Sequence, residues 1–265
     1  MEHLRSDDAE IFYEIRGSGP PVVLLHPFPC DHEFWNPVAV ALESRYRLIL
    51  PDLRGHGDSA IGEGPALMAK HATDVARVLD AADVGRAAFV GCSIGGYTLF
   101  EFWRRFRDRV TALALCDTRP QPDTAEARSN RLQAAATVLE QGTEPFLEAM
   151  IPKLMGRTTV ATRPDVVAGA LVMMRKMSAE DISQVQRGMA DRPDSVPDLK
   201  TINVPTLIVI GEEDTFSTPA DGEFMRQNIA GSHLKVIPKA GHYAPWEQPE
   251  LVGKILRQFL DGVLT

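Results

Sequence analysis

Short, continuous apolar runs separated by helical segments constrain the fold of this chain more than any other sequence feature. Each run is bounded by turn residues and is too short for a helix, a pattern typical of strands buried on both faces. The predicted strands cover residues 22–25, 48–50, 87–90, 113–115 and 207–210, with an antiparallel edge strand at 11–16. The predicted helices cover residues 66–82, 97–106 and 251–260. This alternation predicts an α/β domain with a doubly wound, mostly parallel sheet.

The alternation stops after Asp117. From about Thr118 to Lys200 no run is typical of a strand, and proline-containing segments bound this region at both ends. Amphipathic helical patterns inside it cover residues 132–141, 145–154 and 165–177. Six of the nine methionines also fall here, either as filler of a small core or as the wall of an apolar pocket. We therefore predict a helical cap over residues 118–200, inserted into a core domain of residues 1–117 and 201–265.

Composition excludes several classes of partner. The chain has 36 acidic and 28 basic side chains, and its net charge of -8 would repel phosphate backbones and anionic lipids. No apolar run approaches the ~20 residues that a membrane span needs, and the first residues carry charges where a signal peptide is apolar. The three cysteines have no metal-ligand spacing and are predicted to be reduced, structural thiols. We expect a cytoplasmic protein without nucleic-acid or membrane partners; its oligomeric state is left open.

One pentapeptide has the pattern of a nucleophilic turn. Residues Gly91-Cys92-Ser93-Ile94-Gly95 match G-x-S-x-G and lie between the predicted strand at 87–90 and the following helix. A sharp strand-to-helix turn strains the serine backbone, so the residues two positions away must be small. The same turn exposes the hydroxyl and points the helix N-terminus at the adjacent space. Ser93 is therefore the candidate nucleophile.

A serine hydroxyl needs a base to act as a nucleophile at neutral pH. Of the seven histidines, His242 is the best placed, because it follows the predicted strand at 234–237 and precedes the last helix. The carboxyl ends of parallel strands meet at one edge of the sheet, so His242 would lie at the same edge as Ser93. His56 lies in a turn-rich loop and is the strongest of the other histidines.

The base in turn needs a carboxylate that holds it in the required tautomer. Asp214 follows the predicted strand at 207–210, and the chain order of serine, aspartate and histidine suits this architecture. Glu212, Glu213 and Asp117 are competing carboxylates at neighbouring positions. Asp214 could also serve only as a helix N-cap, although Ser217 or Thr218 suits that role better.

Two backbone amides are expected to stabilise the oxyanion that forms when a carbonyl is attacked. One is the amide of Ile94, directly after the nucleophile. The other comes from the loop His26-Pro27-Phe28-Pro29, where Phe28 has an N–H group and Pro27 has none. His26 ends a strand and is predicted to brace this loop.

These residues together resemble the α/β-hydrolase family along essentially the whole chain. The motifs that carry the resemblance are His26 to Pro29, Pro51 to Ser59, Gly91 to Gly96, Gly211 to Asp214, and Gly241-His242 followed by Glu247-Gln248-Pro249. The resemblance implies an eight-stranded sheet with a helical cap after the sixth strand, and catalytic roles for Ser93, Asp214 and His242. Pro27 departs from the pattern, because relatives often have glycine there. Within the family the chain is similar to capped carboxylesterases and to the 3-oxoadipate enol-lactonase-like group.

The sequence thus predicts a serine hydrolase that cleaves a carboxylic ester or lactone of a small, partly apolar substrate through an acyl-enzyme on Ser93. Neither a metal nor an organic cofactor is required. Carbon–carbon bond hydrolysis or cofactor-free perhydrolysis on the same three residues is an alternative reaction, and a non-catalytic ligand-binding receptor is an alternative class. A serine nucleophile argues against haloalkane dehalogenase and epoxide hydrolase chemistry, which depends on an alkyl ester of aspartate.

Overall fold

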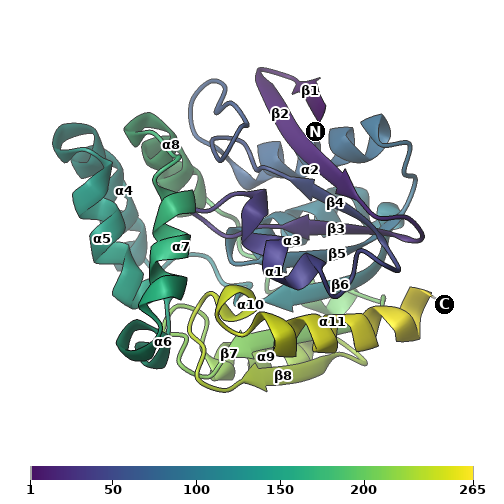
Figure 1. Cartoon of the computed structure of the whole chain (residues 1–265). Helices are drawn as coiled ribbons and strands as arrows, with labels where there is room; N and C mark the ends of the chain where they lie inside the picture. Colours follow the sequence, from purple (N-terminus) through teal and green to yellow (C-terminus); the bar gives the residue numbers. More distant parts are fainter. Residues whose placement is uncertain (1, 265) are drawn as a thin grey trace.

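The computed structural model describes residues 2–264, and within them the strands form one eight-stranded sheet (Figure 1). The strand order is β1-β2-β4-β3-β5-β6-β7-β8. The strands are β1 Glu2–Ser6, β2 Ala9–Arg16, β3 Pro21–Leu25, β4 Arg47–Pro51, β5 Ala87–Cys92, β6 Val110–Cys116, β7 Thr206–Gly211 and β8 His233–Ile237. Strands β3 to β8 pair in parallel, whereas β1 and β2 run antiparallel to their neighbours. The predicted doubly wound, mostly parallel sheet is confirmed.

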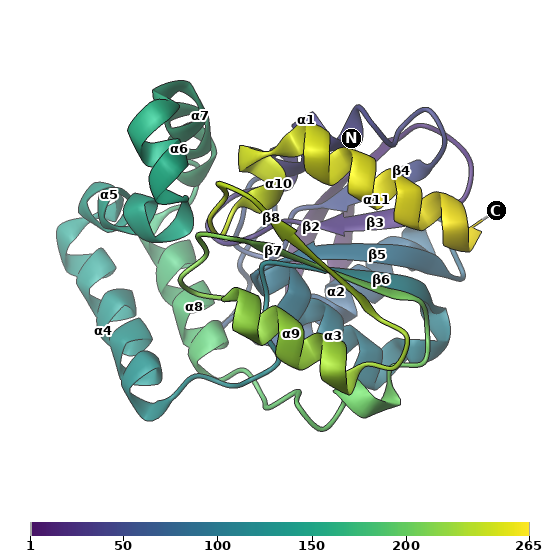
Figure 2. The ribbon, with the colours of Figure 1, turned by 90° about the horizontal axis from the view of Figure 1, so that it is seen from below.

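Helices cover both faces of this sheet (Figure 2). One face carries α1 Asn36–Ala39, α10 Ala244–Glu247 and α11 Pro249–Leu264. The other carries α2 Met68–Ala81, α3 Ile94–Phe106 and α9 Pro219–Asn228. Short 3₁₀ turns lie at His32–Trp35, Arg107–Arg109 and Leu199–Thr201. Every residue of β5 and β7 is buried, which explains why these strands are continuous apolar runs rather than alternating ones.

The prediction that residues 11–16 form the edge of the sheet is wrong. These residues belong to β2, and β1 pairs outside it from Glu2 opposite Tyr13 to Ser6 opposite Ala9. Leu4 is the one apolar residue of β1, so this strand has no hydrophobic pattern to detect. Backbone hydrogen bonds to β2 are sufficient to hold such a polar edge strand.

Five helices lie between β6 and β7, and they stand together beside the sheet in both views (Figures 1 and 2). They are α4 Ala125–Gln141, α5 Thr143–Leu154, α6 Arg157–Thr162, α7 Pro164–Met174 and α8 Ala179–Ala190. The three predicted helical segments correspond to α4, α5 and α7. Helix α6 is too short to show a period, and α8, whose buried Ile182, Val185 and Met189 recur at helical spacing, is not among the predicted segments. Helix α4 begins inside the proline-containing segment that follows Thr118. The Thr124 hydroxyl caps the helix there, because it accepts a hydrogen bond from the Ala127 amide at 3.2 Å.

All three cysteines are buried and unpaired, as predicted. No helix in the described part of the chain is long and apolar enough to cross a membrane.

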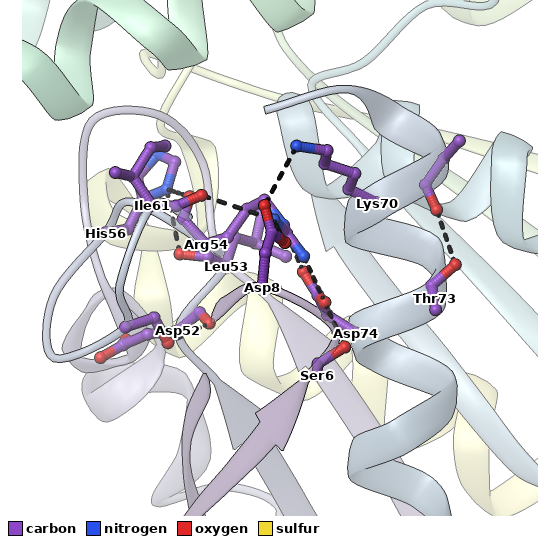
Figure 3. A network of polar contacts seen from close by, with 12 residues as sticks. Ser6, Asp8, Asp52, Leu53, Arg54, His56, Ile61, Lys70, Thr73 and Asp74 are labelled. Carbon is purple, nitrogen blue, oxygen red and sulfur yellow. Dashed lines mark hydrogen bonds and ion pairs between the residues drawn. The ribbon is translucent and has the colours of Figure 1, made fainter. Parts of the chain in front are cut away.

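A buried ion-pair network fixes the loop that follows β4 (Figure 3). Arg54 donates from Nε and Nη2 to the two carboxylate oxygens of Asp74, each at 2.8 Å, and from Nη1 to Asp8 at 3.0 Å. The Ser6 hydroxyl donates to Asp74 at 2.6 Å. The network therefore links this loop to β1, to the β1–β2 turn and to α2. Its consequence for the site is that His56, two residues after Arg54, has a fixed position.

Replacing Arg54 by methionine is expected to lower the free energy of unfolding by about 3–5 kcal/mol, because it leaves the buried Asp74 carboxylate without its partner. Urea denaturation measures this loss. The matched control is Arg128→Met, which breaks an ion pair to Asp191 in which both side chains are about half exposed. That change should cost less than about 1 kcal/mol. Equal losses in the two variants would contradict the importance of the network.

Candidate active site

Ser93 occupies a sharp turn between β5 and α3. Its φ of 53° and ψ of -113° lie where residues with a side chain are rarely found, and such strain costs on the order of 1–3 kcal/mol. Two hydrogen bonds hold the turn: the Ser93 amide donates to Cys116 O at 3.0 Å, and the Thr118 hydroxyl donates to Ser93 O at 2.9 Å. The end of β6 thus supports the strained residue from the neighbouring strand.

The two glycines of the motif permit backbone contacts that any side chain would block. A Cβ atom at Gly91 would lie 2.7 Å from Gly95 O, and one at Gly95 would lie 2.4 Å from Leu25 O. Both separations are shorter than real Cβ contacts. The motif is expected to require small residues at these two positions. The close approach of the backbone explains that requirement.

The structure brings Ser93, His242 and Asp214 into one hydrogen-bonded chain. His242 Nε2 lies 2.8 Å from Ser93 Oγ, and His242 Nδ1 lies 2.8 Å from Asp214 Oδ2. All three residues are buried. The other oxygen of Asp214 accepts from the amides of Phe216 at 2.7 Å and Ser217 at 3.1 Å, which orients the carboxylate. Thr218, and not Asp214, caps α9.

The competing carboxylates contact other groups. Glu212 accepts from the Lys239 amide at 3.2 Å, and Glu213 accepts from the amide and hydroxyl of Thr158 at 2.8 and 2.5 Å. Asp117 accepts from the amides of Gly211 at 2.7 Å and Ala244 at 3.1 Å. Among the described residues, Asp214 is the carboxylate that reaches the ring of His242.

Asp117 has a structural place that its position in the sequence did not reveal. It is fully buried, and its two amide partners are Gly211 at the end of β7 and Ala244 at the start of α10, which adjoin the loops of Asp214 and His242. Burial, and then the negative charge of Asp214, raise the pKa of Asp117 well above its ordinary value. Asp117 thus ties both loops to the end of β6.

Two further glutamates attach helix α6 to the same loops. Glu247 is buried and accepts from the amides of Gly241 at 2.8 Å and Gly156 at 2.9 Å. Glu213, beside Asp214, accepts from the amide and hydroxyl of Thr158, two residues after Gly156. The sequence analysis missed these contacts. The available signal was Glu247 itself, a charged residue that follows the histidine motif at the start of an apolar helix.

The loop after β3 is braced by His26, as predicted. His26 Nε2 accepts from the Leu53 amide at 2.9 Å, and its Nδ1 lies 3.0 Å from Pro27 O, which requires a neutral ring with a proton on Nδ1. Burial lowers the pKa of His26 to about 3, in agreement with a neutral ring. His56 packs edge-on against His26 with ring centroids 4.9 Å apart. The structure thus places His26 and His56 in the support of the loop.

The backbone amides of Phe28 and Ile94 lie at the ends of adjacent strands. Phe28 follows β3 and Ser93 follows β5, and these strands pair with Leu25 opposite Gly91. The carbonyl of Phe28 accepts from the Tyr243 hydroxyl at 2.8 Å, which fixes its peptide. Ile94 is the first residue of α3, where a helix amide has no partner within the helix.

A cavity of about 350 Å³ opens beside the Ser93 hydroxyl. Ser93, His242 and Phe28 line it from the sheet side, and side chains of α4, α5 and α8 line it from the opposite side. Met150 and Met189 belong to this lining, whereas the other four methionines of the inserted segment are buried in the core. Both roles considered for the methionines therefore occur.

One cluster has the composition of a metal site. Side-chain ligand atoms of Asp31, His32 and Asp52 lie within 4.8 Å of one another. The Lys176 ammonium lies 2.7 Å from Asp31, and His32 Nδ1 lies 2.8 Å from Asp52. Lys176, from the α7–α8 connection, therefore already pairs with one acid of the cluster, and His32 is hydrogen-bonded to the other.

The sheet order, the turn at Ser93 and the strand-end loops define the class of this protein. A family model described as alpha/beta hydrolase fold matches residues 20–249, and the chain belongs to that family.

Solved structures and curated proteins of named activity are similar to the chain. A thermophilic esterase from Thermogutta terrifontis, solved with malate bound, is 39% identical with a TM-score of 0.94, over 97% of this chain and 95% of that chain. The enol-lactonase from Burkholderia xenovorans is 27% identical with a TM-score of 0.91, over 98% and 100% of the two chains. The 3-oxoadipate enol-lactonase 2 of Acinetobacter baylyi is 27% identical over 249 residues, which cover 93% of this chain and 91% of that protein.

The stability of the protein is expected to fall as the pH drops below about 6.5, partly because of His26. The pKa of His26 is about 3 in the folded state and near its ordinary value of 6.5 in the unfolded state. Between these pH values the unfolded chain binds the extra proton, so acid favours unfolding by up to about 1.4 kcal/mol per pH unit. Urea denaturation between pH 7 and 4 measures the slope.

His26→Gln removes this titration and should flatten the slope, whereas His3→Gln should not. His3 is a suitable control because its side chain is 47% exposed and pairs with Glu10 at the surface. An unchanged slope in His26→Gln would contradict the assignment of a buried, neutral ring.

Proposed function

We propose that this protein is a serine hydrolase that cleaves a carboxylic ester or lactone of a small, partly apolar substrate. The family and the named relatives share one general activity, and the chain is accordingly a hydrolase of esters or lactones. The finer proposal assigns Ser93 as nucleophile, His242 as general base and Asp214 as the acid that orients the base. It depends above all on the two hydrogen bonds of 2.8 Å that join these side chains beside the cavity.

The first half of the reaction forms an acyl-enzyme. Ser93 Oγ attacks the carbonyl carbon while its proton passes to His242 Nε2, and the carbonyl oxygen becomes an oxyanion. The amides of Phe28 and Ile94 donate to that oxyanion, a contribution worth several kcal/mol of barrier. When the intermediate collapses, His242 gives its proton to the departing alkoxide oxygen.

The second half of the reaction releases the acid. His242 takes a proton from a water molecule, whose oxygen attacks the acyl carbon, and then returns the proton to Ser93 Oγ. Asp214 accepts from His242 Nδ1–H in both halves and stabilises the imidazolium. The amides of Phe216 and Ser217 support this role, because they hold the carboxylate in a fixed orientation toward His242.

We further propose that residues 118–200 act as a cap over a core domain of residues 1–117 and 201–265. The cavity supports this division, since α4, α5 and α8 supply the wall that faces Ser93. A wall of this kind selects the substrate and limits the access of water to the acyl-enzyme. Glu213 and Glu247 connect the cap to the loops of Asp214 and His242 through α6.

Ser93→Ala is expected to lower kcat for activated short-chain esters by a factor of about 10⁴ or more, because no other group can form the acyl-enzyme. The measurement is release of 4-nitrophenol, together with covalent labelling of Ser93 by a fluorophosphonate. Full activity in the variant would refute the proposal. Labelling without ester turnover would favour carbon–carbon cleavage or perhydrolysis, and absence of both would favour a binding receptor.

Asp214→Asn should reduce kcat by about 10⁴, because the amide favours the wrong tautomer of His242. Glu212→Gln is the matched control, since this neighbouring carboxylate contacts only the Lys239 amide among the hydrogen bonds of the described residues. Its kcat should stay within about twofold of the parent. If Glu212→Gln were the more damaging change, the assignment of the acid would be wrong.

A further inference from the structure

The cavity beside Ser93 concentrates positive charge in a protein that is acidic as a whole. Its charged lining consists of Arg119, Arg131, Lys153 and a single acid, Asp123, whereas the entire chain has a net charge of -8. Two positive charges of the lining are therefore uncompensated. A basic pocket inside an acidic protein cannot be explained by the general composition of the chain.

The one acid of this lining is already engaged. Asp123 is almost fully buried, and its oxygens lie 2.7 Å from Arg131 Nε and 2.6 Å from Arg192 Nη1. Burial alone would raise the pKa of Asp123, but the charges of Arg131 and Arg192 outweigh it and hold the pKa below its ordinary value. Arg131 also donates to Gln186 Oε1 at 3.0 Å. Arg131 and Asp123 thus form a structural pair and leave little capacity for a ligand.

Arg119, in contrast to Arg131, has no hydrogen bond to an acid. Its nearest acid is Asp123, and the separation of 3.7 Å between Nη2 and Oδ1 is too long for a hydrogen bond. Its Nε atom is buried and has no hydrogen-bond partner among residues 2–264. The preceding residue, Thr118, donates to the carbonyl of Ser93, so Arg119 is anchored next to the proposed nucleophile. A guanidinium with unused donors is therefore held at the reaction site.

Lys153 adds a second cation from another element. It lies on α5, lines the same cavity, and has no ion pair or side-chain hydrogen bond within the described part of the chain. Lys153 is exposed to solvent, and Arg119, which comes from the segment after β6, is 29% exposed. Two independent parts of the fold therefore place a cation at the same cavity, and neither cation has a side-chain hydrogen bond among residues 2–264. The remainder of the wall is largely apolar and includes Phe28, Phe146 and Met150.

We propose that the substrate is an ester or lactone that also carries a free carboxylate, and that Arg119 and Lys153 bind this carboxylate while Ser93 attacks the ester carbonyl. The planar fork of a guanidinium matches the two oxygens of a carboxylate, and an ammonium adds charge without a fixed direction. The apolar wall accommodates the hydrocarbon part between the two groups. This inference rests on the proposed function, because it names the substrate class of that site.

The experiment compares esters that differ only in the anionic group. The first pair is 4-nitrophenyl hexanoate and mono-4-nitrophenyl adipate, which have acyl chains of equal length. The second pair is phenyl hexanoate and 3-carboxyphenyl hexanoate, which place the carboxylate on the leaving group. We expect at least a tenfold preference in kcat/KM for the acidic member of one pair, mainly through KM, and a weaker preference at high salt.

The variants Arg119→Gln and Arg119→Gln/Lys153→Gln should remove most of this preference, measured as the ratio of kcat/KM between the acidic and the neutral ester of the same pair. Neutral-ester turnover also reports that the variants fold. Arg128→Gln is the matched control, because Arg128 is an exposed cation of α4 that pairs with Asp191 and does not line the cavity. It should leave the preference unchanged.

The outcomes separate this inference from the proposed function. If neither ester of either pair is hydrolysed in a Ser93-dependent way, the proposed function fails. If both members of each pair are hydrolysed through Ser93 without preference for the acid, only the carboxylate site is refuted. A preference that survives the loss of both cations would equally refute the assignment of Arg119 and Lys153.

Discussion

The site depends on a turn in which backbone atoms approach more closely than side chains allow. Gly91 and Gly95 meet each other and the carbonyl of Leu25 at distances that exclude a Cβ atom. This approach lets β5 pass directly into α3 and holds Ser93 at a strained φ of 53°. Because the turn lies where β3 and β5 are neighbours, it also brings the Ser93 hydroxyl next to the loop of Phe28. The parallel sheet provides the rigid frame that tolerates this strain.

Buried carboxylates perform the remaining alignment. Asp117 accepts from the end of β7 and the start of α10, and Glu247 accepts from Gly241 and from Gly156, the residue directly before α6. Each carboxyl group accepts from backbone amides that would otherwise be buried without an acceptor, and leaving such amides unpaired would cost free energy. Together with Glu213 they connect the positions of His242 and Asp214 to the inserted helices.

The electrostatics of the cavity differ from those of the protein as a whole. Asp123 makes its short contacts with Arg131 and Arg192, and Arg119 lies further from it at 3.7 Å, so one acid is shared among three arginines. The Arg119 side chain is 29% exposed and Lys153 is exposed, so water partly screens both charges. Lys153 contributes a second positive charge to the same space. The ligand chemistry of the cavity thus depends on which ion pairs are already complete, and not on the number of charged residues.

The sequence by itself determined the α/β class, the strained serine and the strand-end positions of His242 and Asp214, because each of these depends on local patterns. It did not reveal β1, which is held by backbone pairing, or α6, which is too short to have a period. Only the tertiary structure decided which carboxylate reaches His242 and which arginines make the short contacts with Asp123. Glu247 and Gly156, for example, are 91 positions apart in the chain, and Asp123 and Arg192 come from opposite ends of the inserted segment. Contacts at such separations depend on how the helices pack, and no local pattern encodes them.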